Sequence, residues 1–209
     1  MNTVKICGLK TKEEIRWTAE AGADLGGIVV FYPKSKRNLE IGEAAELVSY
    51  AKSLDKPIKT VAVTVSPELS DIAEIENAGF DYVQIHGELR KEVLEGSKLP
   101  IIKAFNVRDM GDHEKYRDCE KIAGFVFDAG IPGSGTAFDY SLLPLGLMKN
   151  TKGKIMLLAG GLNPDNVSKA LKDTGFKGAD TSTGVEREDG NGKSREKIFS
   201  FVLNARAEI

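Results

Sequence analysis

The chain has 209 residues, enough for one domain with a large core or for two small ones. Hydrophobic residues make up 41% and charged residues 29%, which is ordinary for a folded protein and argues against disorder or a fibrous assembly. The formal net charge is -2, so the chain lacks the positive field that would hold a nucleic acid or an anionic membrane. We therefore expect one compact domain, residues 1–209, with a small-molecule partner.

Cysteine usage and the N-terminal sequence both indicate a cytoplasmic protein. Cys7 and Cys119 are the two cysteines, and they lie too far apart for the short spacings of metal clusters or redox motifs. The first residues carry no basic stretch followed by a long apolar region, as a signal peptide would. No apolar run approaches the roughly 20 residues that a membrane helix needs.

Eight short apolar runs recur along the chain, and each is followed by a stretch with helical spacing. They are Thr3–Cys7, Leu25–Phe31, Lys59–Val65, Phe80–Ile85, Ile101–Phe105, Ile122–Phe127, Ile155–Leu158 and Gly178–Thr181. The runs are rich in β-branched residues and nearly apolar on both faces, which is typical of parallel strands covered on both sides.

The helical stretches between the runs have recognisable starts. N-caps are predicted at Thr11, at Ser66–Pro67 and at Asn163–Pro164. The last stretch, Ser194–Ala207, carries one apolar stripe and should pack on the outside of the sheet.

The alternation of strand and helix fits two architectures. A chain of 209 residues gives about 26 residues to each of eight units, the economy of a small (β/α)8 barrel. An open doubly wound sheet also alternates strand and helix, but eight parallel strands with no antiparallel edge favour the barrel. The first strand is followed by C-G-L-K-T-K and not by G-x-G-x-x-G, and no phosphate-binding G-x-x-x-x-G-K-[ST] occurs. We therefore predict a single-domain (β/α)8 TIM barrel without nicotinamide or ATP chemistry.

In such a barrel the active-site groups follow the strands at the carboxyl-end face. The residues that stand there are Cys7, Ser35, Arg37, His86, Lys103, Asp128, the pair Gly160 and Gly161, and the triplet Ser182, Thr183 and Gly184.

These residues belong to six motifs in a fixed order. They are V-K-I-C-G-L at 4–9, S-K-R at 35–37, Q-I-H-G at 84–87, F-D at 127–128 with G-S-G-T-A-F-D at 133–139, A-G-G-L-N-P-D-N-V at 159–167 and S-T-G-V-E at 182–186. On these motifs the chain resembles the phosphoribosylanthranilate isomerase family of tryptophan biosynthesis over almost its whole length. Two positions depart from the family pattern, Lys36 where proline is usual and Tyr140 where tryptophan is usual.

The resemblance implies an Amadori rearrangement of N-(5-phosphoribosyl)anthranilate without cofactor or metal. Cys7 would be the general base and Asp128 the general acid, because ring opening needs a proton donor and enolamine formation needs a group that removes the C2 proton. Only ~3% of a free thiol is ionised at pH 7, and Lys5 shares the strand face of Cys7 and would favour the thiolate. Without the surrounding motif, Cys7 would be interpreted as a small buried hydrophobic residue and Asp128 as a carboxylate that orders a loop. Asp139 is expected to cap a helix over 140–147.

The remaining residues are expected to bind substrate. The glycine turns Gly160–Gly161 and Ser182–Gly184 would offer backbone and hydroxyl donors to a phosphate, although glycines also serve tight turns. Arg37 would hold the anthranilate carboxylate across the mouth from these turns, unless it is an exposed loop arginine. His86 is expected to bind substrate or to be a structural hydrogen-bonded residue rather than an acid or base.

Some alternatives stay open from the sequence. Lys103 would form a Schiff base in an aldolase or pair with Asp128 or substrate, and the loop 186–194 is interpreted as solvated surface. Another phosphosugar barrel, such as an epimerase or a related aminoaldose isomerase, fits the same pattern, as does a barrel that only binds a phosphorylated metabolite. A monomer and a homodimer are equally compatible with the sequence, and a second, histidine-pathway substrate is not excluded.

Overall fold

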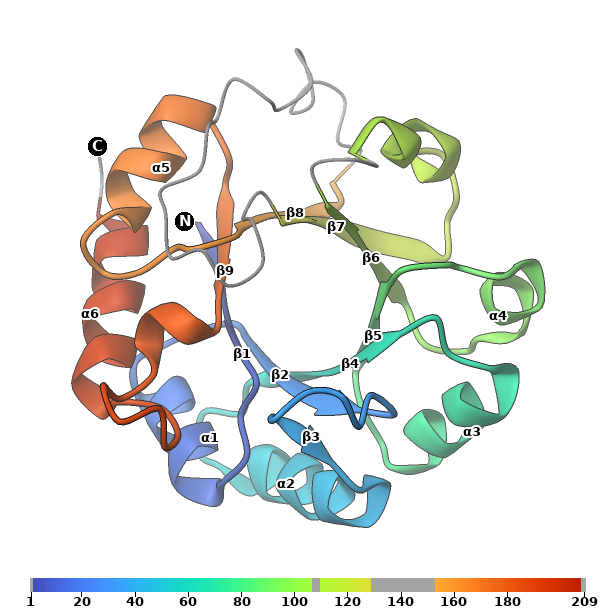
Figure 1. Ribbon diagram of the computed structural model, residues 1–209, viewed down its shortest axis with the longest axis horizontal. Helices are drawn as coiled ribbons and strands as arrows, with labels where there is room; N and C mark the ends of the chain where they lie inside the picture. Colours follow the sequence, from blue (N-terminus) through green and yellow to red (C-terminus); the bar gives the residue numbers. More distant parts are fainter. Residues whose placement is uncertain (1, 107–109, 129–152, 208–209) are drawn as a thin grey trace.

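A closed barrel of parallel strands forms the centre of the molecule (Figure 1). The computed structural model describes residues 2–106, 110–128 and 153–207. β1 (Thr3–Cys7) pairs with both β2 (Leu25–Val30) and β9 (Gly178–Thr181), which closes the ring. The other barrel strands are β4 (Lys59–Val65), β5 (Tyr82–His86), β6 (Ile101–Asn106), β7 (Ile122–Asp128) and β8 (Ile155–Ala159). The predicted (β/α)8 fold is confirmed.

Strand boundaries follow the predicted runs closely. Thr3–Cys7, Lys59–Val65 and Gly178–Thr181 match residue for residue. β2 ends one residue earlier than predicted because Phe31 has a φ of 54°, a left-handed conformation that cannot continue a strand. The two-residue β3 (Asn38–Leu39), which pairs with β2, was not predicted.

Helices surround the barrel in most of the crossovers (Figure 1). They are α1 (Lys12–Glu20), α2 (Ile41–Ser53), α3 (Leu69–Asn77), α4 (Lys91–Gly96), α5 (Val167–Thr174) and α6 (Arg195–Arg206). After β6 the described chain forms the 3-10 helix η1 (Met110–Tyr116), so this unit departs from the expected α-helix. Across the three described ranges, no helix combines the length and apolar character needed to cross a bilayer.

In the first half of the chain the structure confirms one predicted helix start and contradicts another. Thr11 is the N-cap of α1, and its hydroxyl accepts from the backbone N–H of Glu14 at 3.2 Å. The prediction at Ser66–Pro67 is wrong, because Glu68 caps α3 through a reciprocal pair of hydrogen bonds with Asp71. Ser66 instead has a φ of 48° and belongs to the turn before the helix.

At the two C-terminal helices the start of α5 differs from the prediction, and the apolar stripe of α6 agrees with it. The prediction at Asn163–Pro164 places the start of α5 too early, since Asn166 is the N-cap. Asn163 instead shapes the preceding turn, because its side-chain oxygen accepts from two backbone N–H groups beyond it. Ser194 is the N-cap of α6, and the buried residues of that helix form the expected stripe.

Alternation along the strands divides the apolar side chains into two layers. One layer fills the barrel, with Leu25, Val61, Ile102, Val126 and Leu157 among its members. The other lies between the sheet and the helices and is larger. Because all strands run in parallel, their carboxyl ends meet at one mouth, where the last inward-facing residues of several strands are polar.

The close packing of β7 against β8 at Gly124 can be tested by substitution. A Cβ added at Gly124 would lie 2.5 Å from the carbonyl oxygen of Ile155, so Gly124→Ala forces the two strands apart. We expect the free energy of unfolding in urea to fall by about 2 kcal/mol. Gly42→Ala in α2 is the matched control, because nothing lies within 4 Å of the added methyl, and it should be neutral or stabilising by up to about 1 kcal/mol. Equal effects of both variants would contradict this account.

Candidate active site

The thiol of Cys7 lies at the mouth of the barrel, above a buried lysine. Cys7 ends β1, and Gly27 on the neighbouring strand leaves the space beside it: an added Cβ there would lie 3.0 Å from Cys7 Sγ and 3.2 Å from Lys5 Cε. Cys7 and Lys5 therefore share the inner face of β1, as predicted. A larger residue at Gly27 would displace both side chains.

Lys5 is held in place by an ion pair across the closure of the barrel. Its Nζ lies 3.0 Å from both carboxylate oxygens of Asp180, the residue beside it on β9, and its side chain is fully buried. Burial by itself lowers the pKa of Lys5, but the charges of Asp180 and Cys7 outweigh it and raise the pKa overall. Lys5 therefore stays cationic beneath the thiol.

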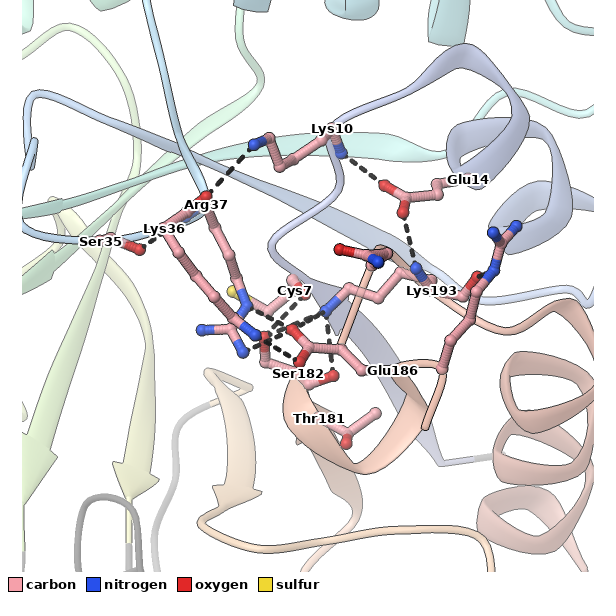
Figure 2. A network of polar contacts seen from close by, with 12 residues as sticks. Cys7, Lys10, Glu14, Ser35, Lys36, Arg37, Thr181, Ser182, Glu186 and Lys193 are labelled. Atoms are coloured by element: carbon pink, nitrogen blue, oxygen red, sulfur yellow. Dashed lines mark hydrogen bonds and ion pairs between the residues drawn. The ribbon is translucent and has the colours of Figure 1, made fainter. Parts of the chain in front are cut away.

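Arg37 lies beside this end of β1 and not across the mouth from the β9 turn, so that prediction is wrong (Figure 2). Gly8 has a φ of 77°, and a Cβ added to it would lie 2.4 Å from Arg37 Cδ and 3.1 Å from Ser182 Oγ. The arginine stem therefore crosses the bare backbone of Gly8 next to Ser182. The reason is local: after β2 the chain turns back, and β3 pairs with Val29 and Val30 of β2, beyond the residues that β1 pairs, which brings Arg37 close to β1.

The departure at Lys36 leaves this loop well anchored. The backbone N–H of Ser35 donates to the carbonyl of Tyr32 at 2.9 Å, and that of Asn38 donates to the carbonyl of Ser35 at 3.0 Å. Lys36 Nζ also lies 3.0 Å from a carboxylate oxygen of Glu186. Main-chain hydrogen bonds and this ion pair supply the restraint that a proline would supply by fixing φ.

The loop 186–194 is not solvated throughout, because Lys193 at one end is buried and Glu186 at the other is half-buried. The side chain of Glu186 is 12% exposed and that of Lys193 is 1% exposed, and the two residues form an antiparallel bridge. Lys193 Nζ donates to the carbonyl and hydroxyl oxygens of Ser182, at 3.0 and 3.2 Å (Figure 2). Glu186 is the last residue of the S-T-G-V-E motif, so the sequence could have indicated that it belongs to the site. No sequence pattern marked Lys193, because its burial depends on how the loop folds back.

The glycine turns after β8 and β9 are packed directly on each other. Gly160 and Gly161 have φ values of 96° and 69°, which other residues rarely adopt. Thr181 Oγ1 donates to the carbonyl of Leu162 at 2.6 Å, and a Cβ at Gly184 would lie 2.0 Å from that same carbonyl oxygen. The two turns therefore form one continuous surface at the mouth.

Within this surface the serine and the threonine differ. The hydroxyl of Ser182 donates to the carbonyl of Cys7 at 3.0 Å and ties the β9 turn to β1. Its own contribution to a ligand is therefore the main-chain N–H. Thr183 is exposed and begins the short η3 (Thr183–Val185), so its hydroxyl is accessible to a ligand.

Asp128 and His86 lie on other strands around the same mouth. Asp128 ends β7, half-buried, in register with Asn106 and Ala159 of the neighbouring strands. His86 ends β5, and its Nε2 lies 2.8 Å from the side-chain amide nitrogen of Gln84. Burial, with the nearby cations Lys5 and Lys103, lowers the pKa of His86 to about 4. The imidazole is therefore neutral at pH 7 and accepts a hydrogen bond.

Lys103 does not enter the mouth. It lies on the outer face of β6, 3% exposed, with its Nζ 4.7 Å from the centre of the Phe105 ring and 2.7 Å from the carbonyl oxygen of Ala104. The inward positions of β6 are those of Ile102 and Ala104. The alternative of a Schiff-base aldolase is therefore contradicted.

Part of the sequence pattern lies outside the described residues. This holds for the G-S-G-T-A-F-D motif at 133–139, for the expected cap Asp139 and for the departure at Tyr140. In the described ranges, His, Cys, Asp and Glu side chains form no group of three that would hold a metal ion.

The closed ring of parallel strands places the chain among the (β/α)8 barrel proteins, in which active-site groups lie at the carboxyl ends of the strands. Residues 4–204 match the family of N-(5'-phosphoribosyl)anthranilate (PRA) isomerase. The chain is 38% identical over 205 residues to the N-(5'-phosphoribosyl)anthranilate isomerase of Streptococcus pneumoniae, covering 97% of this chain and 94% of that protein.

Two solved structures are similar over nearly the whole chain. Mutually generated monomers of the dimeric phosphoribosylanthranilate isomerase of Thermotoga maritima share 31% identity with a TM-score of 0.79 and 99% coverage of both chains. A phosphoribosylanthranilate isomerase in complex with reduced 1-(o-carboxyphenylamino)-1-deoxyribulose 5-phosphate shares 32% identity with the same TM-score and coverage. The chain belongs to the PRA isomerase family. It is an isomerase and not a barrel that only binds a metabolite.

The low pKa of His86 gives a direct spectroscopic prediction. The imidazole should stay unprotonated from pH 8 to pH 5, with a titration midpoint at about 4. In the unfolded chain the same group titrates near 6.5, so the unfolded state binds more protons in this window and stability falls as the pH drops from 6.5 to 4. Imidazole NMR shifts measure the midpoint, and His86→Gln assigns the signal, since the chain has two histidines. A midpoint near 6.5 would show that His86 is solvated.

Proposed function

We propose that this chain, as one barrel domain of residues 1–209, converts N-(5-phosphoribosyl)anthranilate to 1-(o-carboxyphenylamino)-1-deoxyribulose 5-phosphate by an Amadori rearrangement, with no metal or cofactor. The observation that carries the mechanism is the Cys7 thiol above the buried Lys5, with the Asp128 carboxyl group on a strand three places away around the same mouth. One proton acceptor and one proton donor on different sides of the substrate are what the reaction needs.

Asp128 acts first, as the general acid. Its protonated carboxyl group transfers a proton to the ring oxygen of the ribose, the bond between C1 and that oxygen breaks, and a Schiff base between C1 and the anthranilate nitrogen results. Asp128 suits this role by its place at the carboxyl end of β7, at the mouth of the barrel.

Cys7 acts second, as the general base. The thiolate removes the proton from C2 of the Schiff base, and the electron pair moves to give an enolamine that tautomerises to the ketone. The Lys5 ammonium supports the thiolate without contacting the substrate, since it lies one layer deeper in the barrel. The Lys5–Asp180 ion pair keeps that charge at a fixed depth.

Substrate binding spans the strands on either side of Cys7. The phosphate lies on the joined glycine turns, bound by main-chain N–H groups of Gly160, Gly161, Ser182 and Gly184 and by the hydroxyl of Thr183. The anthranilate carboxylate binds Arg37, which stands on the β1–β2 side of Ser182. Neutral His86 offers a hydrogen bond to the sugar. The working unit is a monomer or a homodimer in the cytoplasm.

Replacement of the base tests this mechanism. Cys7→Ala should lower kcat by about 10² or more while the KM changes little, because the thiol acts on the C2 proton and not on binding. The measurement is the fluorescence decrease of phosphoribosylanthranilate on mixing with the purified protein. Cys119→Ala is the control, since Cys119 packs with the outer apolar layer, and it should keep normal turnover. Near-normal kcat in Cys7→Ala would make Cys7 a packing residue.

Replacement of the acid is an independent test. Asp128→Asn keeps the size of the side chain but removes the transferable proton, so turnover should drop by about 10² or more. Binding of reduced 1-(o-carboxyphenylamino)-1-deoxyribulose 5-phosphate, measured by calorimetry, should change less than about threefold. A fully active Asn variant would move the role of acid to another residue at the mouth.

A further inference from the structure

Glu186 stands at the centre of a charge cluster beside Arg37 (Figure 2). Arg37 Nε donates to Glu186 Oε1 at 2.7 Å, and Lys36 Nζ lies 3.0 Å from Oε2. Lys193 Nζ lies 3.6 Å from Oε1. One carboxylate thus faces three cations that come from two different loops.

The cluster is charged at neutral pH and keeps an excess of positive charge. Burial opposes ionisation of Glu186, but the hydrogen bonds from Lys36 and Arg37 outweigh it and lower the pKa of the carboxyl group. Burial lowers the pKa of Lys193, and the carboxylate of Glu14 lies beside the backbone of that residue, so the excess of positive charge rests on Lys36 and Arg37. A second carboxylate brought to Arg37 therefore still meets a favourable field.

The guanidinium of Arg37 keeps a donor that Glu186 does not satisfy. Glu186 Oε1 accepts a hydrogen bond from Nε and lies 2.5 Å from Nη2, but Nη2 is buried and makes no hydrogen bond within the described part of the chain. The other edge, between Nη1 and Nη2, has the spacing for a bidentate carboxylate. The stem of Arg37 rests on the backbone of Gly8, so its root is fixed by packing and its head by Glu186.

We propose that Glu186 is a positioning residue for Arg37, which sets the plane of the guanidinium so that its outer edge receives the carboxylate of the aromatic amine. The proposal rests on the function proposed above for Arg37. Lys36 is 58% exposed and holds the far oxygen of Glu186, so its own contribution is small. Lys193 is buried, and its Nζ lies near Glu186 Oε1. Nζ also donates to the Ser182 hydroxyl, which in turn donates to the carbonyl of Cys7, so the cluster is connected to β1.

The test compares two ligands that differ only in the carboxylate. One is reduced 1-(o-carboxyphenylamino)-1-deoxyribulose 5-phosphate, and the other is the same compound with a phenylamino group. Glu186→Ala should weaken the first by on the order of tenfold and leave the second within threefold of the parent protein. Glu186→Gln keeps an oxygen that accepts from Arg37 and should restore the affinity to within threefold. Glu188→Ala, which removes an exposed charge from the same loop, is the control and should change neither affinity.

A double-mutant cycle separates this proposal from the function on which it rests. If Glu186 acts through Arg37, then Glu186→Ala should cause no further loss of affinity in the Arg37→Ala background. If Arg37→Ala alone does not weaken the carboxylated ligand, the proposed role of Arg37 fails. If Arg37→Ala weakens it by tenfold or more but Glu186→Ala does not, the positioning role of Glu186 fails and the role of Arg37 stands.

Two further outcomes are decisive. An equal loss for both ligands in Glu186→Ala would mean a general collapse of the loop and would overturn the proposal. Should Glu186→Ala fail to fold, Glu186→Asp takes its place, because it withdraws the same charge by one methylene group. Its expected result is a loss of about threefold for the carboxylated ligand alone. No selective loss in that variant would overturn the proposal.

Discussion

The closure of the barrel through β1 is the constraint on which the site depends. β1 pairs with β2 on one side and with β9 on the other, so residues from the two ends of the chain become neighbours. The Lys5–Asp180 ion pair crosses this closure inside the barrel, and the hydrogen bond from Ser182 to the carbonyl of Cys7 crosses it at the mouth. If β1 slipped by one residue against β9, Lys5 would turn outward and leave Asp180 without its partner inside the barrel.

Charge is arranged around Cys7 at two depths. Lys5 lies below the thiol and is shielded from water by the barrel wall, so its effect on the thiol is little screened by salt. The cluster around Glu186 lies at the rim, on the outer side of Gly8, and meets solvent through Lys36. The deeper cation lies directly beneath the thiol, and the rim cations act on the approach of an anionic ligand.

Close approach, more than turn formation, explains the glycines nearest the thiol. At Gly27 the missing side chain gives room to Cys7 and Lys5, and at Gly8 it gives room to the stem of Arg37. At Gly184 it lets the β9 turn rest on the carbonyl of Leu162. In each case the volume of one methyl group decides whether two chain segments meet, because the packing around them has no slack.

The sequence by itself predicted the fold and the strand ends. Strictly local signals sufficed there: apolar runs define strands, and a parallel barrel gathers the residues that follow them at one face. Thus Cys7, His86 and Asp128 were placed at the mouth from spacing and motif alone. Lys103 was the exception, because its side of the strand depends on the alternation with Ala104 and not on its closeness to the strand end.

What only the tertiary structure decided concerns loops and pairs distant in sequence. Arg37 was expected across the mouth, but the added β3 strand turns it toward β1. Lys193 and Glu186 were assigned to a solvated loop, yet an antiparallel bridge joins them beside Arg37, where Lys193 is buried and Glu186 is half-buried. A charged side chain in a loop looks the same in a sequence whether it meets water or a counter-ion. The choice depends on which other segments the closed barrel brings against it, and on the desolvation cost that only a nearby opposite charge offsets.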